Sequence, residues 1–493
     1  MSQLILAIDQ GTTSSRAMIF AVDGGVVAKA QQEFKQYFPK NGWVEHDPLE
    51  IWDVTCRVCK EALSQLADIN DVVGIGITNQ RETTVVWHKE TGQPVCQAIV
   101  WQDRRTADQC KTLKDAGHEG LISARTGLLI DPYFSATKLN WILENVEGAR
   151  ALSEEGKLAF GTIDSWLIWK FTNGVSHVTD ASNASRTLLF NIHTQQWDEE
   201  LLALFKVPKN VLPKVLDNSA DFGLATVGLG GLQLPIAGVA GDQQAAMIGQ
   251  SCFEPGMVKS TYGTGCFALM NLGYTAQKSN NRLLTTIAYR LAGKTTYALE
   301  GAIFVAGAAV QWLRDELGII QQANETEALA SSTDGNKGVY FVPAFTGLGA
   351  PHWCPHARGV IMGLTRNSGK AELARAALEA VCYQTRDLIN AMGEDAGRRP
   401  ALLRVDGGMI ENNWLMQALA NIVDLPVERP AMVESSALGA ARLAGLQLNL
   451  FQSLDAVAKE WQADKRCENE INTSERNAML DGWYKAVRAC QVE

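Results

Sequence analysis

Short apolar runs alternate along the chain with longer segments in which apolar residues recur at helical spacing. Residues 4–34 have the pattern of three strands, and the first turn between them is rich in Gly, Thr and Ser. A helix is predicted over residues 48–66, followed by a second strand–turn–strand unit over residues 72–88. Alternating strands and helices of this kind predict an α/β fold.

The N-terminal pattern recurs at residues 256–272, again as a strand, a Gly/Thr turn and a strand. This spacing is too long for a repeat protein of the solenoid kind. It predicts two large domains that each begin with the same strand–turn–strand unit. We place the boundary at the Pro–Gly turn of QSCFEPG, which gives an N-terminal domain of residues 1–250 and a C-terminal domain of residues 251–493.

The second domain is expected to be rich in helices. Helical patterns cover residues 301–317 and 371–392, and a strand–turn–helix unit covers residues 402–423. The amphipathic tail beyond about residue 450 is predicted to be helical and to take no part in the chemistry.

Composition narrows the class of protein. A formal net charge of −10 argues against a general nucleic-acid binder. The N-terminus lacks the basic region of a signal peptide. The sequence has no uninterrupted apolar stretch of about 18 residues, so no membrane span is predicted. Ten scattered cysteines are typical of a reducing compartment, so we expect a cytoplasmic protein.

Two groups of possible metal ligands are interpreted as structural. Cys56 and Cys59 form a C-x-x-C inside a predicted helix, with no second ligand pair nearby. His352, Cys354 and His356 lie close together in a Pro/Gly-rich segment, which we predict to be a loop without a metal.

The first turn carries the groups that a phosphate site needs. Gly11 lets the backbone approach closely and Arg16 adds positive charge, while Asp9, at the end of a buried strand, is placed to hold water on Mg²⁺. Three hydroxyls can donate to phosphate oxygens, those of Thr12, Thr13 and Ser14. The alternative is an ordinary hairpin whose polar side chains satisfy their own backbone.

Two further Gly-rich turns are candidate nucleotide contacts. Residues 263–268, GTGCFA, fit G-x-G-x-x-A, but a strand follows where a dinucleotide site requires a helix. We therefore reject a dinucleotide site and keep Thr264 and Gly265 as phosphate contacts. Gly408 and Asn412 belong to a segment that begins Asp-Gly-Gly between a predicted strand and a predicted helix. Its two glycines would let a flat adenine lie against bare backbone. The sequence contains no P-loop.

A phosphoryl acceptor requires a base and hydrogen-bonding groups. Asp242 follows a strand at the start of a predicted helix, where it could accept a hydroxyl proton or simply cap the helix. Arg81 and Glu82 offer adjacent donor and acceptor groups in a polar loop, although such pairs are commonly just solvated. Trp101 and Tyr133 could flank the CH₂ groups of a substrate or pack in the core.

Two long patterns identify a resemblance to a known family. Residues 133–145, YFSATKLNWILEN, match the first signature of the FGGY family of carbohydrate kinases, and residues 359–379 match the second. The chain resembles this family over nearly its whole length. The resemblance implies two actin-like, ribonuclease H-like domains with ATP in the cleft between them.

The resemblance also implies roles for individual residues. Asp242 is implied as the catalytic base, and Asp9 and Asp242 as the residues near Mg²⁺. The polyol would be held by Arg81, Glu82, Trp101, Tyr133, Asp242, Gln243 and Phe267. The nucleotide would be contacted by Thr12, Thr13, Ser14, Arg16, Thr264, Gly307, Gln311, Gly408 and Asn412.

Three segments resemble the members of the family that phosphorylate glycerol with ATP, namely residues 78–95, 98–105 and 263–267. A homo-oligomer, either a dimer or a tetramer, is expected on the same grounds. The alternatives are a sugar kinase such as a xylulokinase, an actin-like ATPase, and a ligand sensor of the same fold.

One loop departs from the family. Some bacterial members carry an arginine before the catalytic aspartate that helps to bind an anionic sugar bisphosphate inhibitor. Here residues 228–233 contain no cation, and Gln233 stands where the charge is expected. We therefore expect weak or absent inhibition by such a bisphosphate.

Overall fold

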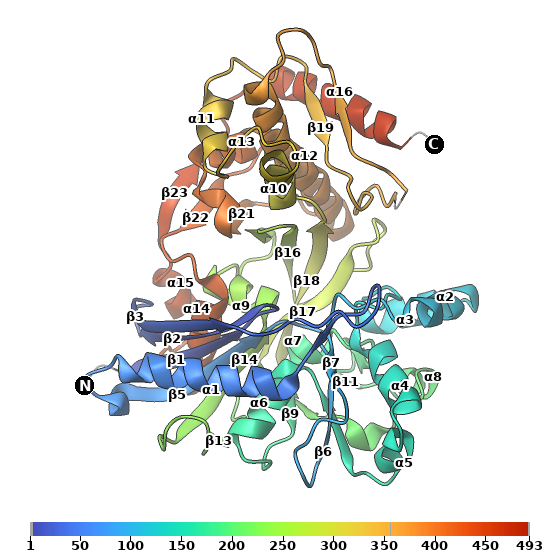
Figure 1. The fold of residues 1–493 in the computed structure, drawn as a ribbon. Helices are drawn as coiled ribbons and strands as arrows, with labels where there is room; N and C mark the ends of the chain where they lie inside the picture. The colour runs from blue at the N-terminus through green and yellow to red at the C-terminus, as the bar shows by residue number, and fades with distance from the viewer. Residues whose placement is uncertain (1–2, 355, 492–493) are drawn as a thin grey trace.

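The computed structural model describes residues 3–354 and 356–491 and has two α/β domains, which occupy the lower and upper halves of Figure 1. Each domain is built on a sheet that contains both parallel and antiparallel pairs. Within the described residues, the first sheet has the strand order β13-β14-β5-β1-β2-β3. Its strands are β1 (Leu4–Gln10), β2 (Ser14–Ala21), β3 (Val26–Glu33), β5 (Val72–Asn79), β13 (Leu224–Ala225) and β14 (Leu234–Gly241).

The second sheet has the order β17-β18-β16-β15-β21-β22-β23 within the part of the chain that the structure describes. Its strands are β15 (Met257–Tyr262), β16 (Cys266–Gly273), β17 (Leu284–Leu291), β18 (Lys294–Ile303), β21 (Leu402–Asp406), β22 (Val427–Pro430) and β23 (Ala463–Cys467).

The two sheets share one plan. β1 pairs antiparallel with β2 and parallel with β5, and β15 likewise pairs antiparallel with β16 and parallel with β21. β1 is buried along its whole length, as expected for an apolar central strand. The two Gly/Thr turns, residues 11–13 and 263–265, therefore occupy equivalent places in the two domains.

The helices pack on these two sheets, on the shorter strands or on one another. In the first domain they are α1 (Pro48–Ser64), α2 (Ala107–Asp115), α3 (Glu119–Thr126), α4 (Ser135–Asn145), α5 (Ala149–Glu154), α6 (Ile163–Phe171), α7 (Ala181–Ala184), α8 (Glu199–Leu204) and α9 (Asp242–Gly249). In the second half they are α10 (Gly307–Asp315), α11 (Glu325–Ser331), α12 (Lys370–Ala396), α13 (Asn413–Val423), α14 (Ser435–Gln447), α15 (Leu454–Lys459) and α16 (Thr473–Cys490).

Short elements complete the two domains. They are β4 (Glu45–His46), β6 (Val85–His88), β7 (Ala98–Ile99), β8 (Leu158–Gly161), β9 (Val178–Asp180), β10 (Phe190–Asn191), β11 (Gln196–Trp197), β12 (Lys214–Leu216), β19 (Tyr340–Val342), β20 (Val360–Met362), and the 3₁₀ turns η1 (Ile69–Asp71), η2 (Lys209–Val211) and η3 (Gly408–Glu411).

The helix α14 belongs to the second half of the chain but packs on the first sheet, against β1, β5 and β14, and against α9 (Figure 1). Glycine makes this contact possible. A Cβ added to Gly76 of β5 would lie 2.2 Å from the carbonyl oxygen of Ala440, and one added to Gly439 would lie 1.8 Å from that of Ala245. The backbones therefore approach more closely than a side chain would permit.

Two sequence predictions are wrong in detail. The helix expected over residues 301–317 begins late, because β18 continues to Ile303 and α10 starts at Gly307. Gly301 is a strand residue, and a Cβ there would lie 2.3 Å from Leu388 of α12. The tail is not wholly helical, since β23 pairs antiparallel with β22 at the sheet edge. Its residues are mostly exposed, so they lack the apolar alternation that predicts a strand.

Among the described residues, none of the helices combines the length and the apolar character needed to cross a membrane.

Candidate active site

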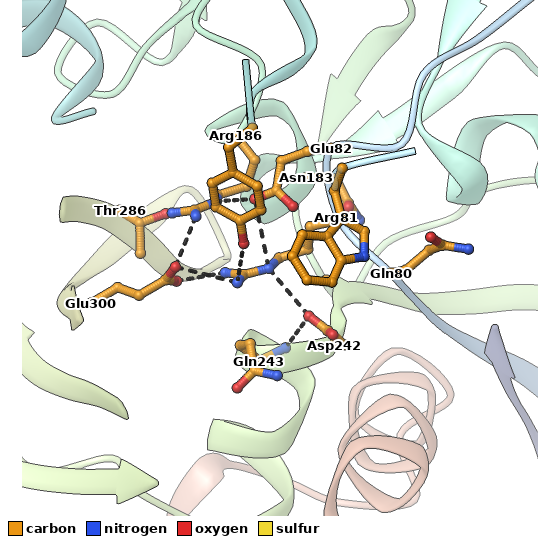
Figure 2. Close-up of polar contacts among 12 residues, drawn as sticks. Gln80, Arg81, Glu82, Asn183, Arg186, Asp242, Gln243, Thr286 and Glu300 are labelled. Carbon is orange, nitrogen blue, oxygen red and sulfur yellow. Dashed lines mark hydrogen bonds and ion pairs between the residues drawn. The ribbon is translucent and has the colours of Figure 1, made fainter. Parts of the chain in front are cut away.

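Side chains from three separate motifs meet where the first domain faces the second (Figure 2). Arg81 and Glu82 come from the loop after β5, and Tyr133 precedes α4. Asp242 and Gln243 are the first residues of α9. The sequence places these residues far apart, and the fold brings them together because β5 and β14 are parallel neighbours that end at the same edge.

Arg81 and Glu82 are not a solvated pair, since they are only 3% and 1% exposed. The two terminal nitrogens of Arg81 donate to the carboxylate of Glu300, at 2.5 and 3.3 Å. Its Nε forms an ion pair with Asp242 Oδ1 at 3.1 Å. The guanidinium therefore links the second sheet to the start of α9.

Glu82 is held in a strained backbone conformation. Its φ is +62°, which is uncommon for a residue with a Cβ. The hydroxyls of Thr84 and Ser135 both donate to its carbonyl oxygen at 3.1 Å. Ser135 opens α4 within the signature of residues 133–145, so that motif helps to shape the loop that carries Glu82.

Asp242 is the first residue of α9, and Gly241 occupies the cap position. Its side chain is 34% exposed and accepts a hydrogen bond from the Gln243 backbone N–H at 2.7 Å. The Gln243 side chain accepts from the buried ammonium of Lys259. Because an ammonium can only donate, this contact fixes the Gln243 oxygen and leaves its NH₂ group as the donor for a ligand.

Aromatic rings form one side of the cluster. Trp101 and Tyr133 meet edge to face with ring centres 5.6 Å apart. The Trp101 indole N–H donates to the hydroxyl of Thr12 at 3.0 Å, which ties this wall to the first Gly/Thr turn. Phe267 lies in β16 on the same face of the sheet as Glu300 in the neighbouring β18.

Asp9 lies at the end of β1, beside the first turn. Burial raises the pKa of its carboxyl to about 6, opposed by Arg16 and reinforced by Asp242 and Glu434. Arg16 forms ion pairs with Asp9 at 3.0 Å and with Glu434 at 2.7 Å. Two carboxylates thus share Arg16, and the charge of Asp242 also acts on Asp9, an arrangement that favours a further positive charge.

A chain of hydrogen bonds connects the backbone carbonyls of the first turn to His46 through Gln36 and Gln80. The Gln36 amide donates to the carbonyl oxygen of Thr12 at 3.0 Å, and its oxygen lies 2.6 Å from His46 Nε2. The Gln80 amide lies 3.4 Å from His46 Nδ1 and donates to the Gly11 carbonyl oxygen at 3.1 Å. His46 therefore carries its proton on Nε2, and burial lowers its pKa to about 4.

A cavity of about 650 Å³ opens in the second domain. Five of the residues implied as nucleotide contacts line it: Thr264, Gly307, Gln311, Gly408 and Asn412. The Gly307 N–H donates to the carbonyl oxygen of Gly263 at 2.9 Å, so the second Gly/Thr turn is bonded to the start of α10. A Cβ at Gly408 would meet nothing within 4 Å, which leaves bare backbone facing the cavity.

Other implied nucleotide contacts do not line this cavity. Gly265 is required by packing, since a Cβ there would lie 2.8 Å from the carbonyl oxygen of Ile303. Thr13 is exposed at the first turn, and Ser14 is buried with its hydroxyl accepting from Gln31 at 3.0 Å. Thr12, Thr13, Ser14 and Arg16 lie at the first sheet, beside Asp9.

Sequence reasoning missed several residues of the site. Arg186 and Glu300 contact Arg81 or Glu82 directly. Each is a lone charge in an otherwise apolar or small-residue segment, SNASRTLLF and TTYALEGAIF, and that mismatch is the signal that could have identified it. No motif marks five further residues that line the cavity, namely Gln322, Ala323 and Asn324 before α11 and Thr326 and Glu327 in its first turn.

The possible metal ligands have other surroundings. Cys56 and Cys59 are buried in α1, where burial raises the pKa of both thiols. His352 Nε2 lies 3.2 Å from Asp387, which also accepts from Trp483. Within residues 3–354 and 356–491, no three His, Cys, Asp or Glu side chains are grouped closely enough to hold a metal ion by themselves.

Duplicated sheets, a nucleotide-sized cavity and a buried polar cluster at the domain junction define a two-domain phosphotransferase. Models of the N-terminal and C-terminal domains of the FGGY family of carbohydrate kinases match residues 4–249 and 258–448. The chain belongs to this family.

Relatives and solved structures agree with this assignment. The chain is 60% identical to the glycerol kinase of Ectopseudomonas mendocina and 59% identical to glycerol kinase 1 of Pseudomonas aeruginosa, each over 100% of both chains. The crystal structure of Plasmodium falciparum glycerol kinase with ADP superposes with a TM-score of 0.96 at 35% identity, over 100% of this chain and 99% of that one. The two-domain fold inferred from the sequence is thereby confirmed.

A sugar kinase shares the fold at lower identity. The xylulose kinase of Lactobacillus acidophilus superposes with a TM-score of 0.88 at 23% identity, over 99% of this chain and 97% of that one.

Proposed function

We propose that this chain transfers the γ-phosphoryl group of ATP to a terminal hydroxyl of glycerol and so forms glycerol 3-phosphate. The observation that carries the proposal is that one connected group of strands and a helix in the second domain contributes residues both to the cavity and to the polar cluster. The hairpin β15–β16 contributes Thr264 to the cavity and places Phe267 on the sheet face that carries Glu300. β18 contributes Glu300 to the polar cluster, and α10, which follows it, contributes Gly307 to the cavity. The full-length identity to glycerol kinases supports glycerol as the acceptor.

The acceptor end of the reaction is assigned to Asp242. Its partly exposed carboxylate would accept the proton of the attacking hydroxyl while the oxygen bonds to the γ-phosphorus and ADP leaves. Arg81, Glu82 and the Gln243 amide would hold the other hydroxyls, and the Trp101 edge would flank the carbon chain. Positioning and electrostatic stabilisation together supply most of the rate in such transfers.

The residues at the first turn fit a magnesium ion. The pKa of Asp9 is raised by burial and by the charges of Asp242 and Glu434, so a cation would relieve the repulsion among these carboxylates. Mg²⁺ is commonly held by one or two carboxylates together with substrate phosphates. We assign Asp9 and Asp242 to it, where it would neutralise charge on the phosphates.

The nucleotide is assigned to the 650 Å³ cavity. Its adenine would lie against the bare backbone at Gly408, and the Gly/Thr turns would reach the phosphates from both domains. Thr12, Thr13, Ser14 and Arg16 would serve from the first turn and Thr264 from the second.

Three broader expectations accompany this function. The ten cysteines are all free thiols, which supports a cytoplasmic location. A homo-oligomer and weak inhibition by a sugar bisphosphate remain predictions from the family resemblance and from the loop at residues 228–233.

The test is a coupled assay of ADP release with Mg-ATP and glycerol, xylulose, gluconate or no acceptor. We expect release with glycerol and background rates otherwise. Release with a pentulose instead would keep the family and reject the acceptor, whereas equal release without any acceptor would indicate an ATPase.

A further inference from the structure

Two buried residues outside the motifs, Arg186 and Glu300, form a closed charge network with Arg81 and Glu82 (Figure 2). We propose that Arg186 and Glu300 are positioning residues that set the polyol-binding geometry of Arg81 and Glu82. This inference rests on the proposed function and adds two residues to it, one of them from the second sheet.

The network alternates in charge and excludes water. Arg186 Nε donates to Glu82 Oε1 at 2.7 Å, and its Nη2 donates to Glu300 Oε1 at 2.8 Å. Glu300 in turn accepts from Arg81, and the four side chains are between 0% and 3% exposed. Burial alone would raise the pKa of Glu300, but Arg186 and Arg81 bring it down to about 2, so its carboxylate stays charged.

Glu300 fixes the plane of the Arg81 guanidinium. Arg81 Nη1 donates to Glu300 and Gln244, and Nη2 donates to Glu300 and the Tyr133 hydroxyl. With both terminal nitrogens held, Nε is aimed at Asp242, 3.1 Å away. A shift of Glu300 would therefore move the group that orients the proposed base.

Arg186 fixes the Glu82 carboxylate in a similar way. It binds Oε1, and the other oxygen is left to accept from a polyol hydroxyl. The guanidinium also lies over the rings of Tyr133 and Phe134, at 5.6 and 5.2 Å from their centres. Arg186 thus contacts two residues assigned to the polyol pocket without itself being placed to react.

Stability alone does not explain this network. Nη1 of Arg186 is buried without a hydrogen-bond partner among the described residues. Buried ion pairs of this kind can often be replaced by apolar side chains without loss of stability. An incompletely satisfied network at a strained loop is typical of a site kept for function.

The chain provides a matched control. Glu428 of β22 is also a buried carboxylate between two arginines, at 3.0 Å from Arg404 Nε and 2.7 Å from Arg466 Nη1. It lies next to the edge strand β23, away from the polar cluster. Glu428→Gln therefore changes the same chemistry where no polyol contact is assigned.

The experiment compares Glu300→Gln, Arg186→Lys and Glu428→Gln with the wild-type protein in the ADP-release assay. We expect the first two to raise KM for glycerol by about 10- to 100-fold, with KM for ATP within about threefold of wild type. Glu428→Gln should leave both values within about threefold. Binding of a fluorescent ATP analogue would show that each variant is folded.

The outcomes separate this inference from the proposed function. A wild type active on glycerol, with Glu300→Gln and Arg186→Lys indistinguishable from Glu428→Gln, would overturn the inference alone. A wild type without acceptor-dependent ADP release would overturn both. If Glu300→Gln does not bind nucleotide, Arg186→Lys, which retains the charge, decides the question by the same selective rise in KM.

Discussion

At Asp242, three features meet in one carboxylate: partial exposure, a position at the start of a helix, and an ion pair with Arg81. A base must lie within hydrogen-bonding reach of the proton that it accepts. The ion pair with Arg81 and the position at the N-terminus of α9 hold the carboxylate in place, and its partial exposure leaves it open to a substrate.

Asp242→Asn keeps the size of the side chain and an oxygen that can face Arg81, but removes the base. We expect kcat to fall by about 10²- to 10⁴-fold with little change in affinity for ATP, measured by ADP release and nucleotide titration. Asp217→Asn is the control, because Asp217 makes a similar contact with Arg290 outside the cleft. Near-normal turnover of Asp242→Asn would remove it from the role.

His46 is connected to the first turn through Gln36, and its protonation is coupled to the stability of the folded protein. Burial lowers its pKa to about 4, so the folded protein keeps the imidazole neutral, while the unfolded chain takes up a proton near the usual histidine pKa of about 6.5. The unfolded state therefore binds more protons between these values, and stability falls as the pH drops from about 6.5 to about 4. At most about 3 kcal/mol is lost through this one group.

His46→Gln should remove that part of the pH dependence, because its amide can still hydrogen-bond Gln36 without titrating. Urea melts at pH 7, 5.5 and 4.5 should show the free energy of unfolding of the wild type falling relative to that of the variant as the pH drops. A difference that stays constant over this range would contradict the assignment. His177, with a similarly lowered pKa, remains in both proteins and cancels.

Among the elements, those with strong local signals could be predicted from the sequence. The hairpins β1–β2 and β15–β16 and the long helix α12 lie where apolar periodicity places them. The prediction at Gly301 was wrong because the sequence does not show that this glycine lies inside a strand and makes room there for Leu388 of α12.

The candidate site was only partly visible in the sequence. Asp242 and the Gly/Thr turns stand in recognisable motifs, but the partners of Arg81 depend on which strands become neighbours. Glu300 lies in β18 and Arg186 follows α7, and neither position carries a local signal beyond an isolated charge. Long-range charge pairing is a property of the tertiary structure.

Contact between α9 and α14 depends on glycine. Gly439→Ala would place a methyl group 1.8 Å from the carbonyl oxygen of Ala245, so the helices must separate. We expect a loss of about 1–3 kcal/mol or more in the free energy of unfolding, measured by urea melts. Gly120→Ala, also in a helix but with nothing within 4 Å, should be neutral or stabilising by about 0.5 kcal/mol. Equal effects of the two changes would show that the contact tolerates a side chain.

The whole molecule is less divisible than its two sheets suggest. Ile5, Met18 and Phe20 of the first sheet are buried under Leu438 and Ala441 of α14. A unit made of the first half alone would leave this apolar face open to water.

A fragment of residues 1–250 is therefore expected to aggregate or to bind a hydrophobic dye strongly. Co-expression with residues 251–493 should suppress the dye binding, because α14 would again cover the sheet. Analytical ultracentrifugation and dye fluorescence measure both effects. A monodisperse fragment without dye binding would show that the first sheet needs no cover from the second half.

The path of α14 also sets an order of events during synthesis. Chains grow from the N-terminus at about 5–20 residues per second, so the first sheet emerges from the ribosome roughly ten seconds or more before its covering helix. During that interval the nascent chain presents an open apolar surface to chaperones and proteases. A stop codon anywhere before Ser435 would make that exposure permanent, so truncated products should be cleared rather than accumulate as half-enzymes.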